Sequence, residues 1–156
     1  MRFLPTTGRT MTNDHFTHLT DGVTIQSPFI WECTRFCLAR NAAPRTAAAL
    51  MLGGCEVGLG NRLTDALGVF DARMVRIYRM LGWSPTILGT AGKGREATSV
   101  GLWAFSPAVR PKLLRRAGLS SDVSTLWYDR AFGRRTLARR KSHRPVLPPF
   151  AVPAFA

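Results

Sequence analysis

The sequence RLTDALGVFDARMVRIYRMLG, residues 62–82, contains a strand followed by a helix and decides the fold class. Residues 62–70 form an apolar run that is typical of a buried strand. Asp71 is a favourable N-cap, and the apolar residues after it recur at helical spacing at Met74, Ile77, Tyr78 and Leu81. Gly82 is suited to ending this helix because glycine readily adopts the left-handed backbone conformation.

Strands and helices alternate on both sides of this step. Before it, the sequence predicts a strand at the start of the chain, a strand over 29–38 and a helix over 47–59. After it come two strands, over 83–89 and 97–105, joined by a Gly-rich hairpin loop, and a last helix over 106–117. This order predicts an α/β protein whose mixed, twisted sheet is covered by helices on both faces.

The composition favours one folded domain with a strong positive charge. The chain has 156 residues, and its 46% hydrophobic content is sufficient for a core. It carries 22 Lys and Arg against 9 Asp and Glu, which gives a formal net charge of +13. This excess favours an acidic partner, which is a nucleic acid, an anionic membrane or an acidic protein.

The charge is concentrated toward the C-terminus. We expect a domain over residues 1–120 and a basic, proline-containing tail over 121–156 that is poorly ordered. Within this tail, residues 130–156 contain many arginines and no carboxylate. We interpret it as a solvated extension. The alternative, a nucleic-acid-binding arm, lacks an RNA-binding motif, so nucleic acid is not the expected partner.

The cysteines and the hydropathy pattern exclude several classes. Cys33, Cys37 and Cys55 are odd in number and lie in apolar surroundings, which favours buried thiols in the reducing cytoplasm. Cys33 and Cys37 fall on a predicted strand with no pair of histidines nearby, so no metal site is expected. There is no apolar run of about 18 residues and no signal-peptide h-region, so no membrane span is expected.

Two common catalytic patterns are not supported either. The loop GTAGKGRE, residues 89–96, is rich in glycine, but no Ser or Thr follows Lys93 and a strand comes next. We therefore interpret it as a hairpin turn rather than a phosphate-binding loop. The three histidines lie in a polar loop or in the tail, and there is no Gly-x-Ser-x-Gly elbow.

Glu32 is the remaining candidate because it interrupts the apolar strand pattern of SPFIWECTRFCLAR, residues 27–40. Charged residues are seldom buried unless they are paired or functional. On a strand Glu32 shares a face with Thr34, whereas Arg35 projects from the opposite face and cannot easily neutralise it. Glu32 therefore either faces a cleft, as a general base would, or pairs with a basic side chain elsewhere.

Three ordered blocks of the sequence resemble the acyl-homoserine-lactone synthases, the autoinducer synthases of quorum sensing. IWECTRF, residues 30–36, resembles the family's Glu-x-Ser/Thr-Arg-Phe signature. RFLPTTGRTMTNDHF, residues 2–16, is similar to the family's Arg-Leu-Leu-Pro-Thr-Thr-Gly stretch, which leads to a Phe. GVFDARMVRIYRMLGW, residues 68–83, is similar to the family's strand, Met-x-Arg helix and Gly-Trp ending. The blocks follow one another in the family's order and are spread over most of the range 2–105.

The resemblance implies a GNAT-like three-layer sandwich and an acyltransferase activity. In this family an acyl chain passes from acyl carrier protein to the amine of S-adenosylmethionine, which is a substrate. The methionine carboxylate then closes the lactone and expels methylthioadenosine. A positioned base would help the amine to lose its proton, and oriented donors would stabilise the negative oxygen that develops.

The resemblance also implies roles for individual residues of the site. Glu32 corresponds to the catalytic carboxylate and is expected to act as a base through water. Arg2, Phe16, Thr34 and Arg35 correspond to the S-adenosylmethionine site, where the arginines would order polar groups and Phe16 would be a pocket aromatic.

Two further expectations concern the acyl chain and its carrier. Gly68 falls where members that prefer 3-oxo chains often carry Thr, so its lack of a hydroxyl argues against that preference. The alternative is that Gly68 merely permits tight strand packing. Acyl carrier proteins are acidic, and we assign their docking face to Arg73, Arg76 and Arg79 on the polar side of the predicted helix. A solvated helix face is the alternative there.

The family's N-terminal third, which helps to enclose S-adenosylmethionine, has no counterpart before residue 2, so we expect an N-terminally incomplete fold with an open sheet edge. Two alternatives to the synthase remain. One is a different GNAT-like acyltransferase that uses acyl-coenzyme A, although ARNAAPRT, residues 39–46, is a poor pyrophosphate loop. The other is an inactive truncated fragment that acts only as a basic binding protein.

Overall fold

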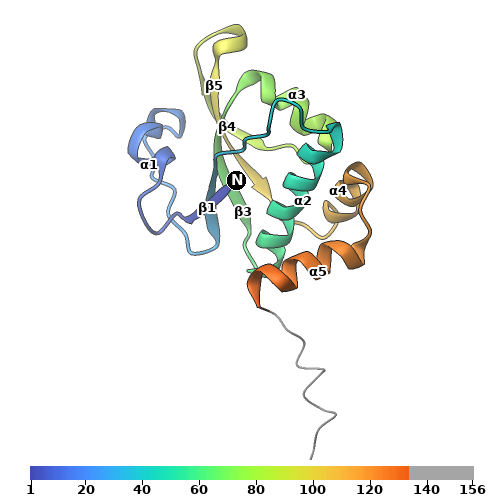
Figure 1. Cartoon of the computed structure of the whole chain (residues 1–156). Helices are drawn as coiled ribbons and strands as arrows, with labels where there is room; N and C mark the ends of the chain where they lie inside the picture. Colours follow the sequence, from blue (N-terminus) through green and yellow to red (C-terminus); the bar gives the residue numbers. More distant parts are fainter. Residues whose placement is uncertain (134–156) are drawn as a thin grey trace, which may run out of the picture.

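A computed structural model describes residues 1–133, so residues 134–156, which make up most of the expected tail, lie outside the described part of the chain. Five strands form one sheet in the order β1-β2-β3-β5-β4 (Figure 1). They are β1 (Arg2–Pro5), β2 (Ile30–Thr34), β3 (Asp65–Asp71), β4 (Thr86–Ala91) and β5 (Thr98–Ala104). Only β2 and β3 are parallel, so the sheet is mixed, as predicted.

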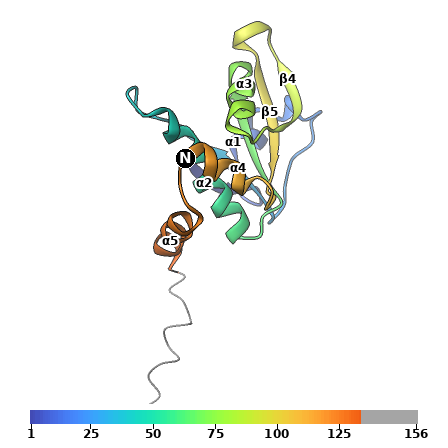
Figure 2. The same ribbon diagram turned by 90° about the vertical axis from the view of Figure 1, so that its right-hand side faces the viewer.

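Helices cover the two faces of the sheet unequally (Figure 1). One face carries α2 (Pro44–Gly60), α3 (Ala72–Leu81) and α4 (Arg110–Ala117), with α5 (Ser121–Phe132) packed against α2 (Figure 2). The other face is covered by α1 (Met11–His15), the 3-10 helix η1 (Thr17–Leu19) and the loop that follows. A second 3-10 helix, η2 (Gly94–Glu96), lies in the predicted hairpin between β4 and β5. No helix of residues 1–133 is long and apolar enough to cross a membrane.

Two apolar cores follow from the alternation of side chains along β3 and β5. Phe70 and Trp103 project toward α2, α3 and α4, where they belong to the larger core. Leu67 and Val100 are fully buried on the opposite face, where they pack with Leu19 of η1. Burial of one such side chain contributes about 1.5–3 kcal/mol, so both faces hold the sheet between two layers.

The strand β2 is shorter than predicted because it ends at Thr34 and not at residue 38. Arg35 has a φ of 56°, in the left-handed region, which interrupts the extended chain. The neighbouring strands also stop pairing with β2 near Thr34, since β1 begins opposite Thr34 and the ladder with β3 ends at Glu32. The predicted alternation of faces therefore holds up to Thr34 and is lost after it.

Residues 121–132, which were expected to belong to the poorly ordered tail, form the helix α5. The Ser120 hydroxyl accepts a hydrogen bond from the Val123 N–H at 3.3 Å and caps the start of the helix. Gly133, with a φ of 69°, ends it. Ser120 and Gly133 are ordinary signals for the start and end of a helix. The prediction assigned this segment to the tail because the sequence that follows is rich in arginine.

Candidate active site

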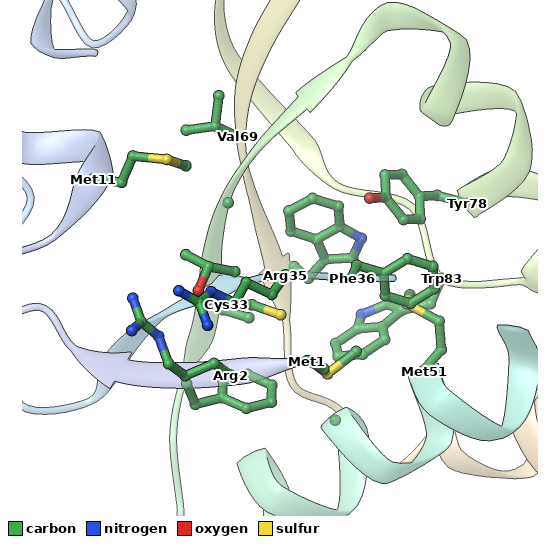
Figure 3. Close-up of a pocket in the computed structure, with 16 residues that line it drawn as sticks. Met1, Arg2, Met11, Cys33, Arg35, Phe36, Met51, Val69, Tyr78 and Trp83 are labelled. Carbon is green, nitrogen blue, oxygen red and sulfur yellow. The ribbon is translucent and has the colours of Figure 1, made fainter. Parts of the chain in front are cut away.

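A cavity of about 360 Å³ opens where β2 and β3 separate (Figure 3). These parallel strands pair only from Ile30 and Asp65 to Glu32 and Leu67, although β3 continues to Asp71. Side chains from β1, β2, β3, β5, α2 and α3 surround the opening, and Met11 of α1 reaches it from the other face. The cavity is therefore built by four of the five strands and two helices, and not by one loop.

One side of the cavity is polar. Arg2 and Arg35 line it, are exposed, and form no salt bridge with any carboxylate of residues 1–133. Thr34, which precedes Arg35 and is the register partner of Arg2, also lines the cavity. Its hydroxyl oxygen is buried and has no hydrogen-bond partner in the described part of the chain. Two unpaired guanidinium groups beside an unpaired hydroxyl are suited to binding an anionic, hydrogen-bonding ligand.

The opposite side is apolar and aromatic, as the labelled side chains of Phe36, Met51, Tyr78 and Trp83 show in Figure 3. Trp103 completes this wall, with its ring centroid 4.9 Å from that of Tyr78 in an edge-to-face arrangement. Burial raises the pKa of Tyr78 to about 12, so its hydroxyl stays protonated at neutral pH. This side can accommodate an alkyl chain.

Gly68 lines the cavity and is buried. A Cβ atom at this position would come within 3.0 Å of Trp103 Cζ3 and 3.5 Å of the Cys33 carbonyl oxygen. The glycine therefore permits the close packing that was one of its two predicted roles. It does so against an indole that also forms the cavity wall.

The Glu32 carboxylate is fully buried and lies outside the cavity lining. Its partners are on α1. Oε2 accepts a hydrogen bond from the Met11 N–H at 3.0 Å, and Oε1 accepts from the N–H and the hydroxyl of Thr12 at 2.7 and 2.6 Å. No basic side chain of residues 1–133 forms a salt bridge with it. Both the expected cleft-facing position and the alternative ion pair thus differ from what is found, because α1 supplies the compensating donors.

Phe16, which was expected in the S-adenosylmethionine pocket, lies outside this cavity. It packs on the opposite face of the sheet against the core of Leu19, Leu67 and Val100. Its ring centroid is 6.1 Å from that of His18. Since β2 carries Glu32 toward the same face, Phe16 and Glu32 both lie in the layer of α1 and η1.

The predicted docking arginines lie together on the exposed side of α3. Arg73, Arg76 and Arg79 are all exposed, while Tyr78 on the inner side is buried. Arg73 forms an exposed ion pair with Asp71 at 2.8 Å. The hairpin helix η2 packs against α3 and adds further positive charge nearby, from Lys93 and Arg95. The arrangement is a basic surface next to, and not inside, the cavity.

Sequence reasoning did not single out Met11 or Trp103. Met11 reaches the cavity only because Glu32 holds α1 against β2, a contact between residues 21 positions apart. Trp103 was part of an apolar strand pattern and carried no separate signal. The one sequence feature that could have drawn attention to Trp103 is its indole N–H, because a buried tryptophan normally donates this group to an acceptor.

The cavity holds one thiol and no metal-binding cluster. Burial raises the pKa of Cys33 to about 11, so the thiol is protonated and a weak nucleophile at neutral pH. Among residues 1–133, no three His, Cys, Asp or Glu side chains come together in a group that could hold a metal ion.

A second cavity, of about 520 Å³, lies between β1, α2 and α5. Its lining is largely apolar and includes Trp127 and Phe132, which are about half exposed. Met1 and Phe3 line both cavities, so β1 forms the wall between them. None of the residues that the resemblance assigned to the site lies in this second cavity.

A sequence profile of the family described as autoinducer synthase matches residues 1–107. The chain belongs to the autoinducer synthase family. This family member is 39% identical over 109 residues to the acyl-homoserine-lactone synthase of Rhizobium etli. The match covers 66% of this chain and 51% of that protein, so the chain spans about half the length of its curated relative.

Solved structures of other synthases are similar in fold to this autoinducer synthase homologue. MesI, a CoA-dependent acyl-homoserine lactone synthase, has a TM-score of 0.69 at 22% identity, covering 77% of this chain and 63% of its own. BjaI, also CoA-dependent, has a TM-score of 0.70 at 23% identity, covering 77% and 58%. The synthase LasI gives 0.59 at 18%, covering 72% and 60%. The GNAT-like α/β fold predicted from the sequence is confirmed.

Proposed function

We propose that the chain functions as an acyl-homoserine-lactone synthase, which transfers an acyl group to the amine of S-adenosylmethionine, closes the lactone and releases methylthioadenosine. The observation that carries this proposal is that Arg2, Thr34, Arg35 and Gly68, which come from three separate blocks that match the family, line one cavity. That cavity has a polar side for a charged amino acid and an apolar side for an alkyl chain.

S-adenosylmethionine is proposed to bind at the polar side. Its carboxylate would pair with Arg2 or Arg35, whose guanidinium groups have no carboxylate partner among residues 1–133. The Thr34 hydroxyl, which lacks a partner, would bond to the same amino-acid moiety. BjaI has been solved with S-adenosylmethionine and isopentyl-CoA, which supports this assignment by analogy of fold.

The first role that we propose for Glu32 is to position α1 beside the cavity. Its three hydrogen bonds hold α1 in place, and Met11 of α1 lines the cavity. Direct proton transfer from the substrate amine would require Thr12 to release Oε1 and a water to bridge the remaining distance. The role of base therefore stays a prediction for this residue.

The acyl donor is proposed to be acyl carrier protein, docked on Arg73, Arg76 and Arg79. A second candidate is acyl-coenzyme A, because both MesI and BjaI are described as CoA-dependent. We also propose a cytoplasmic location, which the three free cysteines support.

The test is to incubate the 156-residue chain with S-adenosylmethionine and either acyl carrier protein or coenzyme A, each loaded with several acyl chains. The expected result is the release of methylthioadenosine and of one acyl-homoserine lactone per turnover. Arg35→Ala should lower this release at least tenfold, whereas Arg130→Ala on α5 should not change it. Absence of methylthioadenosine with every donor would contradict the proposed activity of this chain.

A further inference from the structure

The helix α5 exposes a concentration of large apolar side chains. Leu126, Trp127 and Phe132 are 48, 53 and 52% exposed. The other exposed large apolar side chains of residues 1–133 are scattered over α1, α3, β4 and separate loops. Apolar surface that gathers in one place commonly marks a site of contact with another molecule.

The apolar surface of α5 continues onto neighbouring elements. Trp127 and Phe132 line the second cavity, together with Phe3 of β1 and Trp31 of β2. Tryptophan is enriched at the boundary between the headgroups and the hydrocarbon of a lipid bilayer, because its ring is apolar and its N–H is polar. The composition of this face therefore suits contact with the interface of a bilayer.

A dense positive charge follows α5 directly in the sequence. Asp129 is the last acidic side chain of the chain, and residues 134–144 hold a basic cluster that consists of Arg134, Arg135, Arg139, Arg140, Lys141 and Arg144. On composition alone this segment was interpreted as a solvated extension. The exposed apolar side chains of α5 add a second feature, since a basic cluster next to apolar side chains of a helix is typical of proteins that bind anionic lipids.

We propose that α5 and residues 134–144 form a surface that binds the anionic face of a lipid bilayer. Trp127 and Phe132 enter the headgroup region, and the basic cluster pairs with lipid phosphates. The inference goes beyond the proposed synthase activity and does not depend on it. A peripheral contact of this kind needs no helix that spans the membrane.

Charge and apolarity together favour a bilayer over other occupants of this face. A nucleic acid would pair with the cations but offers no apolar layer for Leu126 and Phe132. A second copy of this chain would cover the apolar side chains, but it carries the same net charge of +13 and would be repelled. An anionic bilayer satisfies both requirements at once.

The proposed lipid-binding surface is separate from the arginines assigned to acyl carrier protein. In both views α5 and α3 lie toward opposite ends of the fold (Figures 1 and 2). A bilayer that contacts α5 therefore leaves α3 accessible, and charges on α3 can serve as a control for charges next to α5.

The test measures co-sedimentation of the 156-residue chain with vesicles of phosphatidylcholine, or of phosphatidylcholine and phosphatidylglycerol in equal parts. The affinity should be at least about tenfold higher for the anionic vesicles and should fall at about 0.5 M salt. Arg139→Gln/Arg140→Gln/Lys141→Gln should weaken it about a hundredfold. The matched loss of three charges on α3, Arg73→Gln/Arg76→Gln/Arg79→Gln, should change it less than about threefold.

The apolar contribution is tested at Trp127. Trp127→Ala should weaken binding to the anionic vesicles about tenfold. Met80→Ala removes a similarly exposed apolar side chain, 54% exposed, from α3 and should leave the affinity within about twofold. Lipids brominated on their acyl chains should quench the tryptophan emission of the wild type more than that of Trp127→Phe, which keeps an aromatic ring.

Four results would each overturn the inference. The first is equal affinity of the wild type for the two kinds of vesicle. The second is an equal loss in the α3 triple variant, which would show that only net charge matters. The third is unchanged binding of Trp127→Ala, which would reduce the contact to adsorption by charge. The fourth is a dimer that dissociates in Trp127→Ala, or tighter binding of a single-stranded oligonucleotide than of the vesicles, since either would assign this face to another occupant.

Discussion

Glu32 shows how a residue can be identified correctly from sequence while its environment is not. The signature around it marked it as important, and the apolar strand pattern predicted burial, which is complete. Its partners, Met11 and Thr12, lie 21 and 20 positions away on a different element. Strand alternation excludes Arg35 as a partner of Glu32. It cannot predict that a helix from elsewhere in the chain packs on the strand and donates backbone N–H groups to the carboxylate.

Replacement of Glu32 by Gln should destabilise the fold. One carboxylate oxygen becomes an NH₂ group that faces a donor of Met11 or Thr12, so about 1–3 kcal/mol of unfolding free energy should be lost. Thr12→Val removes only the hydroxyl donor and should cost about 1 kcal/mol. Urea unfolding of both variants measures this, and an unchanged midpoint for Glu32→Gln would contradict the structural role.

Cys55 should make stability fall at high pH. It is fully buried, and burial, followed by the nearby Glu56, raises its pKa from 9.0 to about 12. The folded state then holds the thiol proton above pH 9 while the unfolded chain releases it, so stability is constant below pH 9 and decreases from there toward pH 12. The contribution is about 1 kcal/mol per pH unit, and Cys55→Ala should flatten the slope in urea unfolding between pH 9 and 11 by that amount. Parallel slopes for the two proteins would contradict this origin.

At the scale of elements, local signals predicted α3 and the hairpin, whereas signals that depend on neighbours were missed. The helix α3 starts after Asp71, as predicted, although the Asp71 carboxylate pairs with Arg73 and does not cap the helix. It ends at Gly82, which has a φ of 89°. The end of β2 depends on where β1 and β3 stop pairing, which no short pattern contains. Gly68 and Arg2 could be assigned to the site because they lie in matched blocks, while Trp103 could not.

A polar network joins α5 to the rest of the fold. Glu56 of α2 accepts hydrogen bonds from Arg110 of α4 at 2.7 Å and from the Ser124 hydroxyl of α5 at 2.5 Å. Glu56→Ala should cost about 1–3 kcal/mol, since it leaves both partly buried donors unpaired. It should also accelerate amide hydrogen exchange in α5 more than in α3. Arg9→Ala, which removes an exposed ion pair, is the control and should cost less than about 1 kcal/mol.

At the scale of the whole molecule, the charge favours encounter with an acidic partner. The net charge of +13 includes the α3 arginines, which project away from the core. Steering of this kind acts mainly on association rates and weakens as salt rises. If α3 is the docking face, reversal of its charges should slow the reaction with a protein acyl donor more than charge reversal at other basic positions does.

The double variant Arg76→Glu/Arg79→Glu should lower kcat/KM with an acyl carrier protein donor about tenfold at low salt, because both exposed charges reverse. The difference should shrink at 0.5 M salt, where charges are screened over only a few ångströms. Arg130→Glu, an exposed reversal on α5, provides the control. An equal decrease in that control would show that only the net charge matters.

The position of β1 has a consequence for how the two hollows behave. This outermost strand has four residues and a single neighbour, and its Phe3, with the preceding Met1, lines both hollows. Fraying at such an end needs far less energy than global unfolding. When this strand frays, Arg2 and Phe3 leave the lining of their cavities, so the local stability of β1 affects both binding spaces at once.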